Sequence, residues 1–303
     1  MTDLAQDWER HMRRGDFAAA WEISDRVLHD RVDRSCWTLP RHLQWVWRGQ
    51  SLAGRRVLVR CFHGLGDTIQ FVRFLPLART IAASITLEAQ PELTRLLWNV
   101  RGVDQLVSLT DASPLVERDV DVELMELPHV LRTTLSTLPR DVPYLSAPSA
   151  RARSSEKLAV GLIWRAGDWD SRRSIPVNLL APLADLPNVE LHALQRGAGL
   201  DDWPREWGPS RGSDDVFEAA CVMRDMDLIL SIDSMPAHLA GALGVPVWTL
   251  LHADCDWRWM DGREDSPWYP TMRLFRQRIS GDWSDVLSRV TDALRRIVPT
   301  AGR

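Results

Sequence analysis

The order of predicted strands and helices constrains this chain more than any other feature. From residue 55 onwards, short apolar runs alternate with segments whose apolar residues recur at helical spacing. In the first half, strands are expected at 55–62, 84–90, 105–109 and 120–126, and helices at 68–82, 91–100 and 128–138. This alternation predicts a parallel sheet with helices packed on its faces.

The same alternation restarts after a stretch that we predict to be a linker. That stretch, residues 144–157, is rich in Ser, Ala, Pro and Arg and has no apolar periodicity. Beyond it, strands are expected at 158–164, 189–195, 228–232 and 245–251, and a final amphipathic helix at 282–298. The predicted fold class is therefore α/β, with two Rossmann-like doubly wound domains, 49–150 and 151–303, that face a cleft. The last helix could pack back on the first domain. Ligands of such sheets bind beyond the carboxyl ends of the strands.

A short helical segment precedes the first domain. Within residues 1–48, apolar positions at helical spacing on either side of Gly15 predict a helical hairpin that ends near residue 30. The stretch RRGDFAAAWEISDRVL resembles the second half of a tetratricopeptide repeat. Because one such repeat cannot bury its own apolar face, we expect a remnant or cap packed on the body of the protein.

Composition excludes several classes of protein. The 303 residues carry a net charge of -4, which argues against a general nucleic-acid binder. The four cysteines have no C-x-x-C spacing, so neither a zinc site nor a disulfide framework is expected. The first residues are too polar for a signal peptide, and no apolar run approaches the length of a membrane span. These features predict a cytoplasmic protein, with peripheral membrane contact left open.

The first candidate loop, Cys61–Gln70, runs from a strand through a glycine-rich turn into a helix. Its spacing matches neither the G-x-G-x-x-G motif nor a P-loop. Asp67 could cap the helix, with Gln70 three residues later completing a capping box. Alternatively, Gly64 and Gly66 allow a close backbone approach, and Asp67 then faces the cleft. There it could take a proton from an acceptor hydroxyl. One residue can serve both purposes.

The second candidate segment follows the strand that ends at Ile232. Asp233 or Ser234 is expected to cap a helix that Gly244 closes. The free N–H groups and positive dipole end of this helix suit a pyrophosphate, to which Ser234 could add a hydroxyl donor. His238 lies about one turn into the helix. It could face the same phosphates or act only as a structural hydrogen-bonding group.

The third candidate loop follows the first strand of the second half. Arg165, Arg172 and Arg173 suit a diphosphate leaving group whose charge must be neutralised. The alternative is a solvated basic loop that Asp168 and Asp170 partly neutralise.

Three further sequence features are weaker candidates for a functional site. The triplets Asp168-Trp-Asp170 and Asp254-Cys-Asp256 have the form of metal motifs, but such triplets are common by chance and no metal is expected. Gln195 and Arg196 end a strand on the same rim and could contact a nucleoside. The aromatic residues of 256–269 are expected to pack in the core or form a lid, with an acceptor platform as the alternative.

Together these segments resemble glycosyltransferase family 9, the heptosyltransferase-like group, especially the bacterial form associated with tetratricopeptide repeats. The matching stretches are GLGDTIQFVRFLPLA, LRTTLSTLPRDVPYL, RSIP, SIDSMPAHLAGALGVPVWTLL, DWRWMDGREDSPWYPTMRLFRQ and GDWSDVL. The resemblance implies a GT-B fold and inverting, metal-independent sugar transfer from a nucleotide diphosphate sugar, usually ADP-heptose.

The resemblance also implies roles for particular residues. Asp67 would be the catalytic base. The resemblance places the diphosphate at Asp233, Ser234, Met235 and His238, and a basic phosphate contact at Arg173 with Arg165 beside it. Ser174, Gln195 and Arg196 are further predicted donor-binding residues because of their position on the same strand rim. From their place in the same loop as Asp67, and not from the resemblance, His63, Gly64, Gly66 and Gln70 are predicted to be acceptor-side or loop residues. The predicted partners are a nucleotide-sugar donor and an acceptor that is a glycolipid, a protein or a small molecule. Two alternatives stay open: a non-catalytic nucleotide-sugar- or protein-binding module, and a transferase that uses a UDP- or GDP-sugar.

Overall fold

The computed structural model describes residues 3–31, 35–36, 38–112, 114–150, 157–167 and 170–298. The chain forms two compact units. The first comprises residues 1–144 together with the short segment Asp256–Gly262, and the second comprises the rest. Thus the segment Asp256–Gly262, which the sequence pattern assigned to the second domain, packs with the first.

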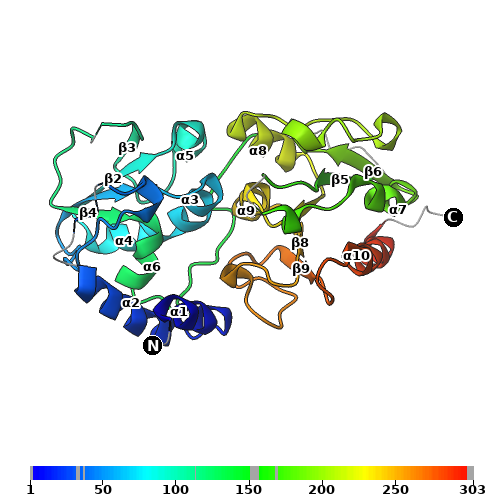
Figure 1. Ribbon diagram of the computed structural model, residues 1–303. Helices are drawn as coiled ribbons and strands as arrows, with labels where there is room; N and C mark the ends of the chain where they lie inside the picture. Colours follow the sequence, from blue (N-terminus) through cyan, green and yellow to red (C-terminus); the bar gives the residue numbers. More distant parts are fainter. Residues whose placement is uncertain are drawn as a thin grey trace. The chain divides into compact units, whose positions relative to one another are not determined.

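The first unit is built on a four-stranded parallel sheet in the order β3-β2-β1-β4. Figure 1 shows this sheet among helices α3 to α6. Its strands are β1 (Arg56–Arg60), β2 (Ser84–Ala89), β3 (Gln105–Ser108) and β4 (Val120–Glu123). Its α-helices are α1 (Leu4–Arg13), α2 (Phe17–Arg31), α3 (Leu65–Phe71), α4 (Leu75–Ile81), α5 (Thr94–Leu97) and α6 (Leu127–Val130). Short 3-10 helices are η1 (Arg41–Leu43), η2 (Val72–Phe74), η3 (Pro91–Leu93), η4 (Leu124–Glu126) and η9 (Trp257–Trp259).

The second unit contains a five-stranded parallel sheet in the order β6-β5-β7-β8-β9. Its strands are β5 (Leu158–Ile163), β6 (Val189–Ala193), β7 (Leu228–Ile232), β8 (Val247–Leu251) and β9 (Met272–Arg276). Its α-helices are α7 (Ala181–Ala184), α8 (Val216–Arg224), α9 (Met235–Ala242) and α10 (Trp283–Ile297). Its 3-10 helices are η5 (Ser171–Arg173), η6 (Val177–Leu180), η7 (Gly197–Gly199) and η8 (Arg205–Trp207).

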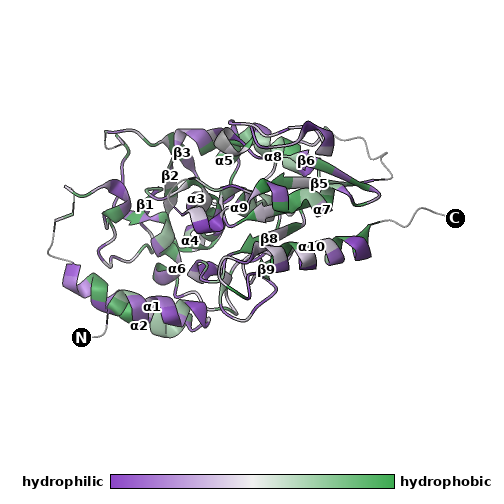
Figure 2. Ribbon diagram, turned by 45° about the vertical axis from the view of Figure 1, so that its right-hand side comes forward, coloured by the Kyte–Doolittle hydropathy of each residue, from purple (hydrophilic) through white to green (hydrophobic). Residues whose placement is uncertain are grey.

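Burial explains why these segments become strands and helices. All five residues of β7 and all five of β8 are buried, as expected for central strands of a parallel sheet that is covered on both faces. Helix α10 instead alternates hydrophobic and hydrophilic residues along its length (Figure 2). Its apolar side, which includes Val286, Val290 and Leu294, is buried.

The helical hairpin expected near the start of the chain is present. Helices α1 and α2 flank Gly15, whose φ of 75° is the left-handed conformation that favours glycine. The apolar faces of both helices pack inward, with Met12, Phe17 and Trp21 buried. The hairpin's relation to tetratricopeptide repeats stays a prediction.

Several predicted elements differ from the observed ones. The helix expected at 128–138 ends with α6 at Val130, because the chain turns at Arg132, where φ is 50°. The helix expected at 68–82 is divided into α3, η2 and α4. Strand β9 was not predicted, since the short stretch that forms it directly follows the aromatic loop and was not recognised as a separate strand. In the predicted linker, Ser149 and the N–H of Ala150 bond to Asp225, and residues 151–156 lie outside the described part.

Candidate functional site

The carboxylate of Asp67 lies in the first turn of α3, directly after β1. Gly64 is the N-cap residue of this helix, and its N–H donates to Asp67 Oδ2 at 3.0 Å. The prediction that Asp67 itself is the N-cap, with Gln70 completing a box, is therefore wrong by one turn. Asp67 instead occupies the third helical position and reaches back, as the acidic partner in a capping box does. Its side chain keeps 28% of its surface exposed, so the same carboxylate remains open to a ligand.

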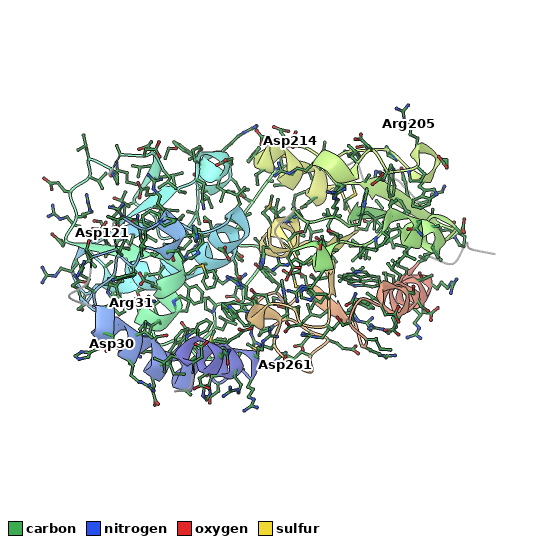
Figure 3. All side chains as sticks on the ribbon, in the orientation of Figure 1. Asp30, Arg31, Asp121, Arg205, Asp214 and Asp261 are labelled. Carbon is green, nitrogen blue, oxygen red and sulfur yellow. The ribbon has the colours of Figure 1, made fainter. Side chains whose placement is uncertain are left out.

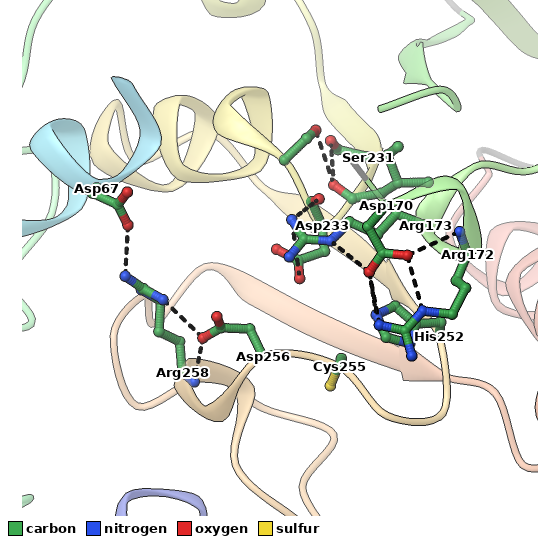
Figure 4. Close-up of polar contacts among 12 residues, drawn as sticks. Asp67, Asp170, Arg172, Arg173, Ser231, Asp233, His252, Cys255, Asp256 and Arg258 are labelled. Carbon is green, nitrogen blue, oxygen red and sulfur yellow. Dashed lines mark hydrogen bonds and ion pairs between the residues drawn. The ribbon is translucent and has the colours of Figure 1, made fainter. Parts of the chain in front are cut away.

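Arg258 of η9 holds the other oxygen of Asp67. Its Nη2 lies 2.5 Å from Asp67 Oδ1 (Figure 4). Its Nε donates to Gln70 Oε1 at 2.8 Å. Gln70 is fully buried, so it does not lie on an exposed acceptor surface. Arg258 was not among the predicted site residues, because the stretch 256–269 was expected to pack in the core or form a lid, with an acceptor platform as the alternative. The signal for Arg258 in the sequence is a single charge between Trp257 and Trp259.

Behind this loop lie two carboxyl groups, of which Glu123 is buried and Glu126 is half-buried. Glu123, at the end of β4, accepts hydrogen bonds from the backbone N–H of Phe62 at 3.3 Å and of Met125 at 2.6 Å. Burial nevertheless raises the pKa of Glu123 to about 8 and that of Glu126 to about 7. His63 Nε2 lies 3.9 Å from Glu123 Oε2, and burial lowers the pKa of His63. Neither glutamate was among the predicted site residues.

In the second unit, α9 begins shortly after the carboxyl end of β7. Ser234 is the N-cap, and its hydroxyl donates to the carbonyl of Ile232 at 3.3 Å. Asp233 is buried beside it. His238 is also buried, and its Nδ1 lies 3.0 Å from the hydroxyl of Tyr269, which matches the structural alternative for this residue. Met235 and Pro236 form the first turn, which leaves the early N–H groups of α9 at the sheet rim.

A network of charges joins three strand ends of the second unit (Figure 4). Arg173, with only 12% of its side chain exposed, donates to the carbonyl of Asp233 at 3.1 Å and lies 3.7 Å from a carboxylate oxygen of Asp170. Arg172 contacts Asp170 at 2.9 Å and Asp254 at 3.8 Å. His252 Nε2 lies 3.8 Å from Asp170. Hydrogen bonding from Arg172 holds the pKa of Asp170 below its usual range.

A pocket of about 320 Å³ opens beside this network. Its volume is within the range of small-molecule sites, although at the lower end. It is lined by Trp164, Arg165, Ala166, Gly167, Ser171, Ser174, Ile175, Pro176, Val177 and Asp202. The pocket thus brings together two predicted donor-binding residues, Arg165 and Ser174, with a carboxylate from Asp202 that the sequence analysis missed.

The remaining predicted contacts have local partners. The amide of Gln195 bonds only to backbone among its described contacts. It accepts from the N–H groups of Trp164 and Arg165 and donates to the carbonyls of Arg165 and Arg196. The exposed guanidinium of Arg196 donates to Asp214. Gln195 therefore shapes the pocket wall by tying the end of β6 to the end of β5.

The aromatic and acidic features are explained by packing and pairing. Trp259, Trp268 and Tyr269 are fully buried, as expected for core packing. Asp256 accepts a hydrogen bond from Arg258 Nη1 at 2.9 Å. Among the residues that the structure describes, no group of three or more His, Cys, Asp or Glu side chains could hold a metal ion. Asp168 lies outside that part. None of the described helices is both long and apolar enough to cross a bilayer.

Comparison with known sequences gives one distant relative. No protein-family model matches the chain. Protein FlbA of Caulobacter vibrioides is 27% identical over 288 aligned residues, which cover 82% of this chain and 48% of FlbA. The chain therefore spans about half the length of this curated relative.

Comparison with solved structures is more informative about the fold. The family 9 glycosyltransferase of Veillonella parvula aligns with a TM-score of 0.63 at 12% identity, covering 82% of this chain and 98% of that one. The E. coli heptosyltransferase WaaC, solved with ADP-2-deoxy-2-fluoro heptose, aligns at 0.53 and 11% identity, covering 80% and 98%. At such identities the likeness establishes architecture. The chain has the two parallel-sheet α/β domains of GT-B heptosyltransferase structures, as its sequence predicted.

Proposed function

We propose that this protein is an inverting glycosyltransferase that moves a sugar from a nucleotide diphosphate sugar to an acceptor hydroxyl. The observation that carries the proposal is the carboxylate of Asp67. It is partly exposed at the end of a parallel strand, and both of its oxygens are held by hydrogen-bond donors. A carboxylate fixed in this way suits proton abstraction, because a general base must be aimed at the proton it removes.

In the proposed reaction the acceptor oxygen attacks the anomeric carbon of the donor sugar. Asp67 takes the hydroxyl proton as the new C–O bond forms, and the bond between the anomeric carbon and the phosphate oxygen breaks. The nucleoside diphosphate leaves with the bonding electrons, so a single displacement inverts the anomeric centre. The acceptor class stays open, with a glycolipid, a protein and a small molecule as candidates.

The donor is proposed to bind the second unit. The early N–H groups of α9 and its dipole would face the pyrophosphate, and the hydroxyl of Ser234 lies at the same helix end. The nearby pocket offers the guanidinium of Arg165 for phosphate and the carboxylate of Asp202 for ribose hydroxyls. ADP-heptose is the leading donor, because WaaC was solved with an ADP-heptose analogue.

The largely enclosed side chain of Arg173, of which 12% is exposed, changes the role that we propose for it. Its described contacts run to Asp170 and Asp233, so we propose that it stabilises the loop which carries Ser174 and does not clamp the donor directly. This arrangement also favours a second candidate, a nucleotide-sugar-binding module without catalysis. Release of nucleoside diphosphate from the donor separates the two, since only the enzyme produces it.

The test combines donor screening with one substitution. The protein is incubated with ADP-, UDP- and GDP-sugars, ligand binding is followed by thermal shift, and diphosphate release is measured. Asp67→Asn keeps the shape of the side chain but removes the base, so turnover should fall by about 10²–10⁴-fold while donor affinity changes little. Asp202→Asn is the matched control, since it should weaken donor binding with less effect on turnover at saturation. Equal turnover by Asp67→Asn would remove this carboxylate from the mechanism.

A further inference from the structure

We propose that Arg258 is a positioning residue for Asp67, and that the α1–α2 hairpin holds Arg258 in place through the segment Asp256–Gly262. We call this segment the brace. The inference rests on the proposed function, because it assigns Asp67 a task that requires a fixed orientation. It gives the hairpin an internal role within the first unit, in place of a partner-binding one.

The guanidinium of Arg258 is engaged on every side. Nη2 bonds to Asp67, Nε to Gln70 and Nη1 to Asp256, at 2.5, 2.8 and 2.9 Å respectively. Its carbon also lies 5.6 Å from the ring centre of Phe71 and 4.7 Å from that of Trp257. Only 10% of the side chain is exposed. A planar fork with several donors makes this set of bonds, and a lysine ammonium cannot reproduce it.

Two hydrogen bonds, one to each carboxylate oxygen, together restrict rotation of the Asp67 side chain. Oδ2 is held by the N–H of Gly64 within the same loop, and Oδ1 is held by Arg258, which is 191 residues away in the chain. With Arg258 removed, the local bond alone would remain, and the carboxylate could turn about it. Small misplacements of a reacting group are costly in rate, so the effect should appear in turnover.

The brace is in turn held by the hairpin. The rings of Trp8 and Trp257 meet edge-on, with centroids 5.3 Å apart. The N–H of Asp261, labelled beside α1 in Figure 3, donates to the carbonyl of Arg13 at 3.0 Å. Between these contacts, buried Met260 has a φ of 48°. A residue other than glycine keeps such a conformation only where its surroundings enforce it, and here the hairpin supplies the surroundings.

The far end of the hairpin has its own anchor. Trp21 Nε1 donates to the carbonyl of Thr133 at 2.7 Å, and Asp25 pairs with Arg132 at 2.7 Å. Truncation of Trp8 should therefore loosen the contact with the brace while α2 stays attached. This separation allows the hairpin's influence on Asp67 to be tested without detaching the hairpin.

The first experiment does not depend on catalysis. Hydrogen–deuterium exchange is followed in peptides covering 62–71 for the wild type and for Arg258→Ala, Arg258→Lys and Trp8→Ala. We expect about tenfold faster exchange in both Arg258 variants and about threefold faster exchange in Trp8→Ala, although Trp8 has no described contact with that loop. Trp98→Ala is the matched control, because Trp98 is 77% exposed in the same unit and its loss should leave these peptides unchanged. Unchanged exchange in Trp8→Ala would overturn the role of the hairpin.

The second experiment measures transfer with the donor identified by the screen. Arg258→Ala should lower kcat by about 10–100-fold and leave the donor KM within about threefold, and added guanidinium ion should restore part of the rate. Arg258→Lys should recover little. A raised donor KM with normal kcat would make Arg258 a donor-binding residue and overturn the proposal. If the wild type transfers no sugar from any donor, the proposed function fails, while the exchange experiment still decides whether the brace orders the Asp67 loop.

Discussion

The polar groups at the rims of the two sheets are assembled in different ways. In the second unit, Asp170, Asp233 and His252 each follow a strand of one parallel sheet, and Arg173 joins two of them. In the first unit, Asp67 also follows a strand, but the cation that pairs with it comes from a segment 191 residues later. The charged residues of the second rim therefore come from neighbouring strand ends. Those of the first rim include Arg258, which comes from the brace, a segment far along the chain.

This difference predicts which property of each rim a substitution should change. The second rim depends on Arg173, a largely enclosed cation between two carboxylates, so loss of this residue should lower the stability of the loop that carries Ser174. The first rim depends on the contact of Arg258 with Asp67 and on the carboxyl groups of Glu123 and Glu126 beneath the loop. Its sensitivity should appear in orientation, as argued for Arg258, and in pH dependence.

The largest expected effect on stability comes from the second rim. Arg173→Ala removes the cation that Asp170 and Asp233 share. Loss of one partner of a buried ion pair costs about 3–5 kcal/mol, and we expect the lower end of that range because Arg173 is partly exposed and Arg172 still pairs with Asp170. The free energy of unfolding, measured by urea denaturation, gives the size of the loss. Arg172→Ala is the matched control, because its side chain is 61% exposed and exposed pairs contribute about 1 kcal/mol or less. Equal losses for the two variants would contradict the buried network.

The next effect concerns the first rim and its dependence on pH. Burial raises the pKa of Glu123 to about 8, well above the ordinary value of 4.5, so the folded state holds a proton that the unfolded state has lost. Stability should therefore fall as pH rises from about 5 to 8, by an amount on the order of a few kcal/mol.

Glu123→Gln should reduce that slope, since the amide cannot ionise, and the smaller decline that remains should come from Glu126, whose pKa is also raised. Thermal melting across pH 5–9 measures it, and Glu117→Gln, with a side chain 88% exposed, is the control that should keep the wild-type slope. A wild-type melting temperature that does not decline over this range would argue against a protonated Glu123.

The smallest effect tests how tightly α9 is packed in the second unit. A Cβ atom added at Gly241 would lie 2.4 Å from the ring of Tyr269, which is fully buried and bonded to His238. Gly241→Ala should cost about 1–3 kcal/mol by overpacking and should weaken nucleotide binding at the other end of the helix. Gly167→Ala meets no atom within 4 Å and should leave stability unchanged. A neutral Gly241→Ala would show that α9 can shift at little cost.

Much of this molecule follows from its sequence. The alternation of apolar runs and helical segments determined two parallel sheets, because strands buried on both faces must be apolar throughout. It also located Asp67 and Ser234 at strand ends, since Gly-rich turns and caps are local signals. The paired helices before residue 32 were equally readable from the spacing of apolar positions.

What the tertiary structure alone decided is which distant groups meet. Arg258 pairs with Asp67, the pKa of Glu123 is raised, and His238 bonds to Tyr269 because of burial and contacts between segments far apart in the chain. Periodicity and caps depend on residues within a few positions of one another, so they cannot predict contacts between residues that are far apart in the chain. Ion pairing and desolvation depend on distance and burial in space, and these exist only once the chain has folded.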